Sequence, residues 1–279
     1  KGAIVLADGA STVSPSYASE VASDPALGFG LEGVLRSKGD RFVGILNGAD
    51  YDEWNPARDQ FIERHFSSTR RNGKARCRVA LRSRLKLPAR DDVPIVAMIT
   101  RMSPQKGIDL VAEALDRIMA SGVQLVMLSS GDPGQEAFFK AAEKRYPDAL
   151  RVILGFDDGL AHLIQAGSDI FLMPSRFEPC GLTQMYALKY GTVPVVRATG
   201  GLRDTVTEFD PLTAAGNGFV FTEYTAAAMV AALERAVTMF LEGTHWRRLM
   251  GNCFRSNFSW DRAAREYLEW FGRLRQDAH

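Results

Sequence analysis

One glutamate lies in a short loop at the place where an open parallel β-sheet would bind a ligand. The loop, residues 175–181, carries Glu178, followed by Pro179 and Gly181. The apolar run 169–173 before it is typical of a buried parallel strand, and 182–190 has the composition and spacing of a helix. The loop therefore joins the carboxyl end of a strand to the amino end of a helix, where free backbone N–H groups attract anions and open α/β sheets bind ligands. An isolated glutamate is usually a plain surface residue, but this shaped turn favours a functional site.

A second loop of the same kind carries two cations. Arg101 and Lys106 follow the strand-like run 94–99 and precede a helix-like run that begins at Gly107. An arginine presents a planar fork to phosphate oxygens, and a lysine presents a compact charge. Two surface cations would be the simpler interpretation of either residue alone. Their shared position at the ligand-binding edge favours a clamp for a diphosphate.

Small and aromatic residues end the neighbouring strands. Gly131 and Asp132 follow the run 123–129, and Phe156 follows the run 150–154. Small residues let a ligand approach the backbone closely. Phe156 could stack on a base, although a buried aromatic is the more common role.

The elements that must position these residues alternate regularly along the chain. Strand-like runs lie at 94–99, 123–129, 150–154, 169–173, 192–196 and 218–221, with helix-like runs such as 107–120 and 135–145 between them. Such alternation predicts an α/β domain, a Rossmann-type doubly wound parallel sheet with helices on both faces. We expect this domain over residues 48–258, and helices from Thr225 onward, the last one starting at Ser259-Trp260 and ending near Leu274.

The first 47 residues look like the tail of another domain. We expect a strand at 10–13, a helix at 17–21 capped by Ser14 and Pro15, a loop over 22–41 and a strand at 42–46. Residues 47–50 end that strand in a polar turn that suits a hinge between domains.

Two further expectations concern the stretch after the hinge. Helices are predicted around 58–66 and 75–85, the second dense in basic residues and interpreted as a solvated face. The segment 28–33 matches GxGxxG, but no strand-like run precedes it, so we reject it as a dinucleotide-binding motif.

Composition excludes several classes of function. The formal net charge of +1 argues against a nucleic acid or membrane partner, and no apolar run approaches about 20 residues. No signal-peptide pattern is seen at the first residues. The three cysteines are widely spaced and suit reduced thiols of an intracellular protein. The four histidines are scattered, so no metal-ligand motif is recognised and we expect no metal.

The two loops together resemble a known family. Residues 176–184, Arg-Phe-Glu-Pro-Cys-Gly-Leu-Thr-Gln, and the spacing Arg101-x-x-x-Gln105-Lys106-Gly107 are similar to the donor-site loops of bacterial glycogen synthases and plant starch synthases. These are retaining glucosyltransferases of the two-domain GT-B fold. Related GT-B families have a second Glu eight positions after the first, where this chain has Tyr186. That departure agrees with the glycogen and starch synthases.

The resemblance implies roles for individual residues. Glu178 would contact the donor glucose and stabilise its oxocarbenium-like charge, while Arg101 and Lys106 would hold the phosphates of ADP-glucose and stabilise the departing ADP. Leu182 and Thr183 would offer amides to the diphosphate, and Cys180 and Gly181 would lie against the sugar. The remaining donor-binding residues are expected to be Asn47, Gly131, Asp132 and Phe156, with Phe156 beside the adenine.

The resemblance also implies what the chain lacks. The family's Lys-x-Gly-Gly-Leu motif and catalytic His belong to its amino-terminal domain, and neither is present here. We therefore expect the carboxyl-terminal portion of a GT-B glucan synthase. Residues 1–47 would be the tail of the amino-terminal acceptor domain and the hinge, 48–258 the nucleotide-sugar domain, and 259–279 a helix packing back toward the amino-terminal domain. The expected ligands are ADP-glucose, as donor substrate rather than cofactor, and α-1,4-glucan. The expected location is the bacterial cytoplasm rather than a plastid. A non-catalytic nucleotide-sugar or glucan-binding module and a GT-B enzyme that uses UDP-glucose stay open as alternatives.

Overall fold

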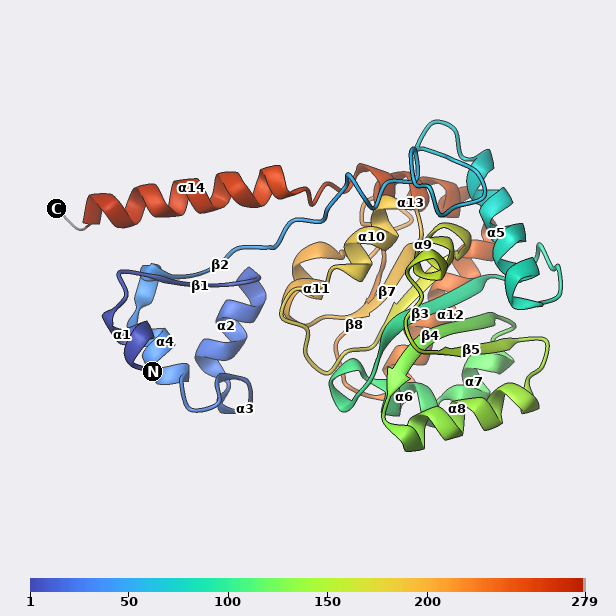
Figure 1. Cartoon of the computed structure of the whole chain (residues 1–279), viewed down its shortest axis with the longest axis horizontal. Coiled ribbons are helices and arrows are strands. Elements are labelled where there is room, and N and C mark those ends of the chain that lie inside the picture. Colours follow the sequence, from blue (N-terminus) through green and yellow to red (C-terminus); the bar gives the residue numbers. More distant parts are fainter. Residues whose placement is uncertain (278–279) are drawn as a thin grey trace.

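The computed structural model describes residues 1–277 and consists of a large α/β domain and a smaller amino-terminal part beside it (Figure 1). The large domain holds a parallel sheet of six strands in the order β5-β4-β3-β6-β7-β8. Its strands are β3 (Ile95–Met102), β4 (Gln124–Gly131), β5 (Leu150–Leu154), β6 (Ile170–Met173), β7 (Val193–Arg197) and β8 (Phe219–Phe221). Each lies within a few residues of a predicted run, so the prediction of a doubly wound α/β sheet is confirmed.

The strand order reverses between β3 and β6. From β3 the chain builds outward through β4 to β5, and it then returns to place β6 on the other side of β3. The loops that leave the carboxyl ends of β3 and β6 diverge at this point, and open α/β sheets bind ligands in the crevice that such a reversal creates. These are the two loops that carry the predicted cations and the predicted glutamate.

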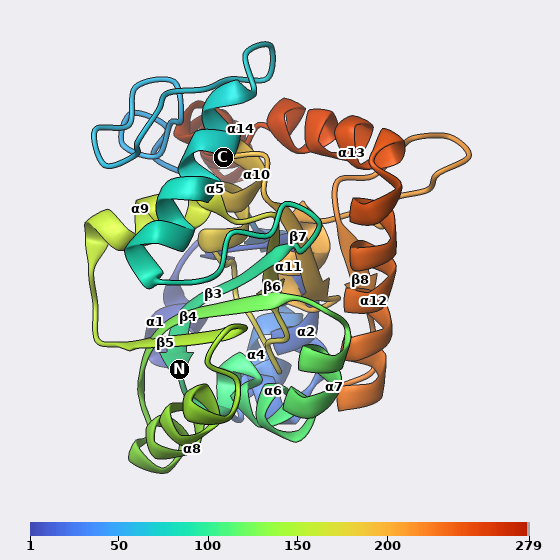
Figure 2. The same cartoon turned by 90° about the vertical axis from the view of Figure 1, so that its right-hand side faces the viewer.

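Alternating side chains of the strands form a core on each face of the sheet. Val96 and Met98 of β3 point into one hydrophobic cluster, and Ile95 and Ala97 point into another, as the two-residue period of a strand requires. On one face lie α5 (Asn72–Leu85), α9 (Asp158–Gly167) and α11 (Gly200–Thr205); on the other lie α6 (Ile108–Glu113), α7 (Leu115–Ala120), α8 (Pro133–Arg145) and α12 (Ala226–Glu242). Figure 2 shows α5 and α8 on opposite sides of the strands.

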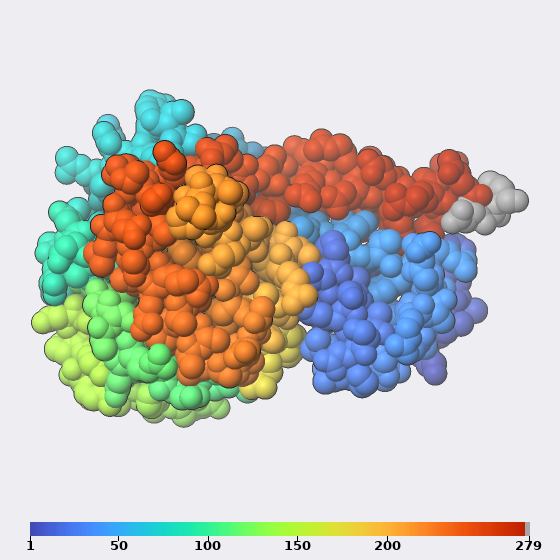
Figure 3. All heavy atoms as spheres, turned by 180° about the vertical axis from the view of Figure 1, so that it is seen from behind, coloured from blue at the N-terminus to red at the C-terminus, as the bar shows by residue number. Residues whose placement is uncertain are grey.

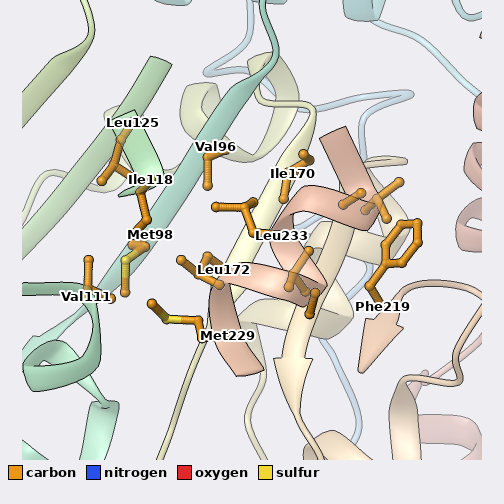
Figure 4. Close-up of a cluster of buried hydrophobic side chains, with 14 of the residues drawn as sticks. Val96, Met98, Val111, Ile118, Leu125, Ile170, Leu172, Phe219, Met229 and Leu233 are labelled. Carbon is orange, nitrogen blue, oxygen red and sulfur yellow. The ribbon is translucent and has the colours of Figure 1, made fainter. Parts of the chain in front are cut away.

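The larger cluster joins the sheet to α12. Figure 4 shows Val96, Met98 and Leu172 of the strands facing Met229 and Leu233 of α12. The remaining helices of this domain, α10 (Thr183–Lys189) and α13 (Thr244–Arg255), pack against each other beside β7. None of the helices described over residues 1–277 is long and apolar enough to cross a membrane.

The amino-terminal residues form a small lobe of their own (Figure 3). Two parallel strands lie at its centre, β1 (Ala10–Thr12) and β2 (Phe42–Gly44). Short helices surround them: α1 (Gly2–Leu6), α2 (Pro15–Ser23), α3 (Pro25–Gly28), α4 (Glu32–Ser37) and a 3-10 turn at Gly39–Arg41. The last helix, α14 (Trp260–Asp277), extends along this lobe, and Gly9 packs directly against Trp270 and Leu274. The predicted segment 259–279 includes Ala278 and His279, which lie outside the described residues, and the three domain boundaries stay predictions.

Two local predictions were wrong because short polar side chains direct the backbone. Residues 22–41, predicted as loop, contain α3 and α4, and Asp24 caps α3 by accepting a hydrogen bond from the amide of Ala26. Residues 58–66, predicted as a helix, form successive turns instead. There Asn55 and Asp59 bind amides two residues ahead in the chain, which is the local competition that keeps Asn and Asp out of helix interiors. Helices α2 and α3, rather than a strand, lead into the GxGxxG segment, in which Gly30 has φ +79°.

The interpretation of 75–85 as a solvated basic face was also wrong in part. Within α5, Lys74 and Arg82 are buried. Arg82 donates to the side chain of Gln124 at 2.8 Å and to the carbonyl of Val93 at 2.7 Å. Arg78 pairs with the buried Asp169 at 3.1 Å. These cations fasten α5 to the amino ends of the strands.

Candidate active site

A cavity of about 450 Å³ opens at the carboxyl ends of β3 and β6. Its floor is apolar, formed by side chains of the strands themselves, and its rim is polar. The floor residues are Met98, Ile99, Leu128, Leu172, Met173 and Pro174, and the rim residues include Arg101, Lys106, Ser130, Phe156, Ser175, Glu178 and Thr183. An apolar cavity with a few convergent polar groups is the usual form of a small-molecule site.

An ion pair between the two predicted loops is the central feature of this cavity. The ammonium of Lys106 lies 2.6 Å from Oε2 of Glu178, and the buried hydroxyl of Ser175 donates to the same oxygen at 3.0 Å. Glu178 is only 5% exposed. A buried carboxylate needs such partners to offset its loss of water, and Lys106 and Ser175 also fix its orientation.

Glycine and backbone hydrogen bonds hold the two loops together. The amide of Arg176 donates to the carbonyl of Gln105 at 2.8 Å. Gly107 has φ +71°, and a Cβ there would lie 2.0 Å from the carbonyl oxygen of Pro174. Any other residue at 107 would separate the loops that carry Lys106 and Glu178.

Helix α11 supports the glutamate loop from the other side. The amide of Gly201 donates to the carbonyl of Glu178 at 3.0 Å. A Cβ at Gly201 would lie 2.0 Å from the carbonyl oxygen of Cys180. The glycine pair at the start of α11 therefore allows the helix to touch the backbone of the loop.

The amino-terminal lobe reaches the same loop through α2. The hydroxyl of Ser14 donates to the carbonyl of Pro179 at 2.6 Å, and the hydroxyl of Ser16 donates to Asp204 of α11 at 2.6 Å. Glu20 accepts a hydrogen bond from the amide of Gly200 at 2.8 Å. The start of α2 thus contacts both the glutamate loop and the helix that supports it.

Seven of the predicted site residues meet around the cavity, and four do not. Those that line it are Arg101, Lys106, Phe156, Glu178, Gly181, Leu182 and Thr183. Phe156 is 84% exposed, so its ring is free to stack on a ligand. The amides of Gly181, Leu182 and Thr183 donate to no other residue within the described part of the chain.

The other four residues have structural surroundings that explain their position. Gly131 packs against the backbone of Met102, and Asp132 caps α8 by accepting from the amide of Gln135 at 2.9 Å. Cys180 is buried behind the loop, and Asn47 donates a backbone hydrogen bond to it. None of them, including Asn47, lines the cavity, and their part in donor binding stays a prediction.

Burial also changes the acidity of groups beside the loop. It raises the pKa of the Cys180 thiol to about 11, so this thiol stays protonated and unreactive at neutral pH. Burial likewise raises the pKa of Tyr186 to about 12. The Tyr186 ring stacks on Trp54, with centroids 4.2 Å apart.

The sequence did not single out Ser175, whereas it placed Ser130 within the stretch 130–132 expected at the binding edge. Ser175 stands three residues before Glu178 in the same turn, a spacing at which a hydroxyl reaches a carboxylate. This local spacing could have identified Ser175 as a partner of Glu178 from the sequence. The inward position of Ser130 depends on the register of β4, in which Ser130 pairs with Arg101.

Comparisons with known proteins agree with this geometry. Residues 81–242 match the family described as "Glycosyl transferases group 1". A glycogen synthase from Anaeromyxobacter sp. (strain Fw109-5) is 49% identical over 267 residues, covering 96% of this chain and 56% of that protein. Glycogen synthase 2 from Nitrosococcus oceani is 44% identical over 277 residues, covering 98% of this chain and 56% of the relative.

Solved structures give the same result. The catalytic domain of starch synthase IV from Arabidopsis thaliana, bound to ADP and acarbose, matches with a TM-score of 0.92 and 40% identity, covering 98% of this chain and 57% of that one. Sucrose-phosphate synthase from Thermosynechococcus elongatus matches with a TM-score of 0.67 and 21% identity, over 99% of this chain and 60% of that one, which shows a shared fold alone. The chain thus spans somewhat more than half the length of the relatives it matches.

Proposed function

We propose, because this chain belongs to the glycosyl transferases of group 1, that it forms the donor-binding half of a glucosyltransferase. The donor would be ADP-glucose, and the product an α-1,4-glucan extended at its non-reducing end with retention of configuration. Two facts support this choice among the group 1 enzymes. Its relatives at 44–49% identity are glycogen synthases, and the starch synthase IV structure that it resembles contains ADP.

The Lys106–Glu178 pair carries the proposal. It places a cation and a carboxylate 2.6 Å apart on the polar rim of a cavity that also bears Arg101. A nucleoside diphosphate bound here would set its phosphates against Arg101, Lys106 and the free amides of residues 181–183. The attached sugar would then lie against Glu178.

The chemistry follows from where charge develops. When the bond between the sugar and the diphosphate breaks, negative charge grows on the leaving ADP and positive charge on the sugar ring. Fixed cations and amides that face the first charge, and a fixed carboxylate that faces the second, stabilise the transition state without reorganisation. We assign the first role to Arg101 and Lys106 and the second to Glu178.

The partners of this half follow from the same proposal. An α-1,4-glucan would approach on the side of α2 and α11, where the amino-terminal lobe adjoins the glutamate loop. A further GT-B domain would complete the acceptor site, and we propose the bacterial cytoplasm as the location.

Calorimetric titration of the chain with ADP and with ADP-glucose tests the proposal. Replacing Arg101 or Lys106 with Ala should weaken ADP binding by one charge-assisted contact, roughly 1.5–3 kcal/mol. Arg265→Ala, an exposed arginine of α14 far from the cavity, should leave the affinity unchanged. Unchanged affinity in both cavity variants would remove the clamp.

Parallel thermal melts test the choice of donor. Preferential binding to the folded state raises apparent stability, so ADP-glucose should raise the melting temperature more than UDP-glucose or NAD. A larger shift with UDP-glucose would change the donor, and a larger shift with NAD would revive the GxGxxG segment.

A further inference from the structure

A cluster of three possible metal ligands lies outside the donor cavity. Glu53, Asp158 and His162 each offer one ligand atom, and these atoms lie within 4.8 Å of one another. Asp158 and His162 stand one turn apart at the start of α9, and Glu53 comes from the turn that follows β2 and the hinge. None of the three lines the cavity, and among the described residues neither carboxylate has a cation within 4 Å.

The ring of His162 is held in one orientation. Trp54 stacks on it, with centroids 3.7 Å apart and planes 14° apart, and Phe61 lies 4.8 Å away at a tilt. His162 itself is 0% exposed. Trp54 covers one face of the imidazole, and a ring nitrogen binds a metal in the plane of the ring, which this stacking leaves open.

Hydrogen bonding decides which nitrogen is available. Nδ1 lies 2.8 Å from Oδ2 of Asp59. Tyr190 donates its hydroxyl to the same oxygen, and the amide of Phe61 donates to the other oxygen of Asp59 at 2.8 Å. Asp59 thus engages Nδ1, and Nε2 is the ring nitrogen that this hydrogen bond leaves available.

That second nitrogen is buried and has no hydrogen-bond partner. An unpaired buried polar atom is costly and is rare enough to need a reason. A carboxylate that holds Nδ1–H while Nε2 points toward further ligands is the arrangement that usually orients a metal-binding histidine.

We propose that Glu53, Asp158 and His162 form a binding site for a divalent transition-metal ion of the Zn²⁺ class, with Asp59 and Tyr190 as the groups that orient His162. An imidazole nitrogen with carboxylate oxygens suits Zn²⁺ better than Mg²⁺ or Ca²⁺, which prefer oxygen alone. Two atoms that each lie about 2.1 Å from one ion can be at most about 4.2 Å apart. The exposed side chain of Glu53 can supply the small closing movement. The bound ion would fasten the turn after the hinge to α9, two residues beyond Phe156.

The experiment uses the untagged chain after treatment with EDTA and removal of the chelator. Calorimetry with Zn²⁺ should show one equivalent bound, with a rise in melting temperature, and Mg²⁺ and Ca²⁺ should give neither. Glu53→Gln and Asp158→Asn should each weaken Zn²⁺ binding at least about tenfold, as the loss of even an orienting partner does in known sites. Both variants keep side-chain size, and the melt without metal shows whether they fold.

Matched controls separate this site from general surface binding. Glu63→Gln and Asp148→Asn remove exposed carboxylates elsewhere and should leave Zn²⁺ affinity unchanged. Nitrogen NMR of labelled histidines should move the Nε2 resonance of one buried histidine on addition of Zn²⁺. Absence of one-equivalent binding, or binding that both site variants retain in full, would overturn the proposal.

Discussion

At the scale of single residues, the proposed function depends on Glu178, a carboxylate that the fold buries. Glu178 is held by Lys106 at 2.6 Å and by Ser175 at 3.0 Å. Two specific partners thus contact the carboxylate in place of water. The same two partners orient the carboxylate. A substitution that removes the charge of Glu178 but keeps its size therefore tests the charge alone.

We predict that Glu178→Gln, made in a complete glucan synthase that contains this half, lowers kcat by about 100-fold or more. The amide keeps the size of the side chain but cannot stabilise positive charge on the sugar ring. ADP affinity should change much less, because an interaction made only in the transition state affects turnover rather than binding. Glucose incorporation into glycogen and calorimetry with ADP measure the two quantities, and Glu223→Gln, an exposed glutamate outside the cavity, is the matched control. Equal losses in both quantities would assign Glu178 to ground-state binding, and no loss would remove it from the catalytic centre.

At the scale of elements, close backbone contacts position the site. Helix α11 touches the glutamate loop through Gly200 and Gly201, and the lysine loop touches it through Gly107. In each case the missing side chain lets one backbone approach another to within contact distance. The geometry of the ion pair is therefore set by glycines that carry no chemistry themselves.

Gly201→Ala tests this dependence. A Cβ 2.0 Å from the carbonyl of Cys180 must displace the loop, and overpacking of this kind usually costs about 1–3 kcal/mol of stability. We expect a lower free energy of unfolding in urea and weaker ADP binding by the folded variant. Gly272→Ala is the control, because a Cβ there meets nothing within 4 Å and lies in α14. It should leave ADP binding unchanged and, by its helix propensity, stabilise the chain by up to about 1 kcal/mol. Normal ADP affinity in Gly201→Ala would mean that the loop tolerates displacement.

At the scale of the whole molecule, the amino-terminal lobe adjoins the loop that carries Glu178. Ser14, Ser16 and Glu20 join that lobe to the glutamate loop and to α11. These hydrogen bonds fix the position of the lobe relative to the loop that carries Glu178. The chain covers 56% of the glycogen synthase from Anaeromyxobacter sp. (strain Fw109-5). The proposed division is that this half binds the donor and a further domain binds the acceptor.

We therefore predict that the 279-residue chain binds ADP-glucose but scarcely transfers glucose. Positioning of the acceptor against the donor supplies much of the reduction of a bimolecular barrier, and that positioning would require the further domain. Incorporation of labelled glucose into glycogen should be negligible with the chain alone and should appear when an amino-terminal glycogen synthase domain is restored in the same reading frame. Calorimetry with ADP on the same preparation is the control for folding. Robust incorporation by the chain alone would contradict this division.

The sequence by itself determined the order and type of the main elements and the two loops to which we assign the chemistry. Hydrophobic runs of strand length recur at regular intervals, and their two-residue period encodes which side chains face each layer. The loops after β3 and β6 could be identified for the same reason, since residues at strand ends are local features. Arg101, Lys106, Glu178 and the family to which they point followed from those loops.

Only the tertiary structure decided which of these residues touch. Lys106 and Glu178 are 72 positions apart, and they meet because β6 pairs with β3 rather than with β5. The same applies to Arg78, whose partner Asp169 comes immediately before β6, so a helix face that looks solvated in sequence is partly buried. Long-range pairing of this kind depends on sheet order and strand register, which no local pattern of residue types contains.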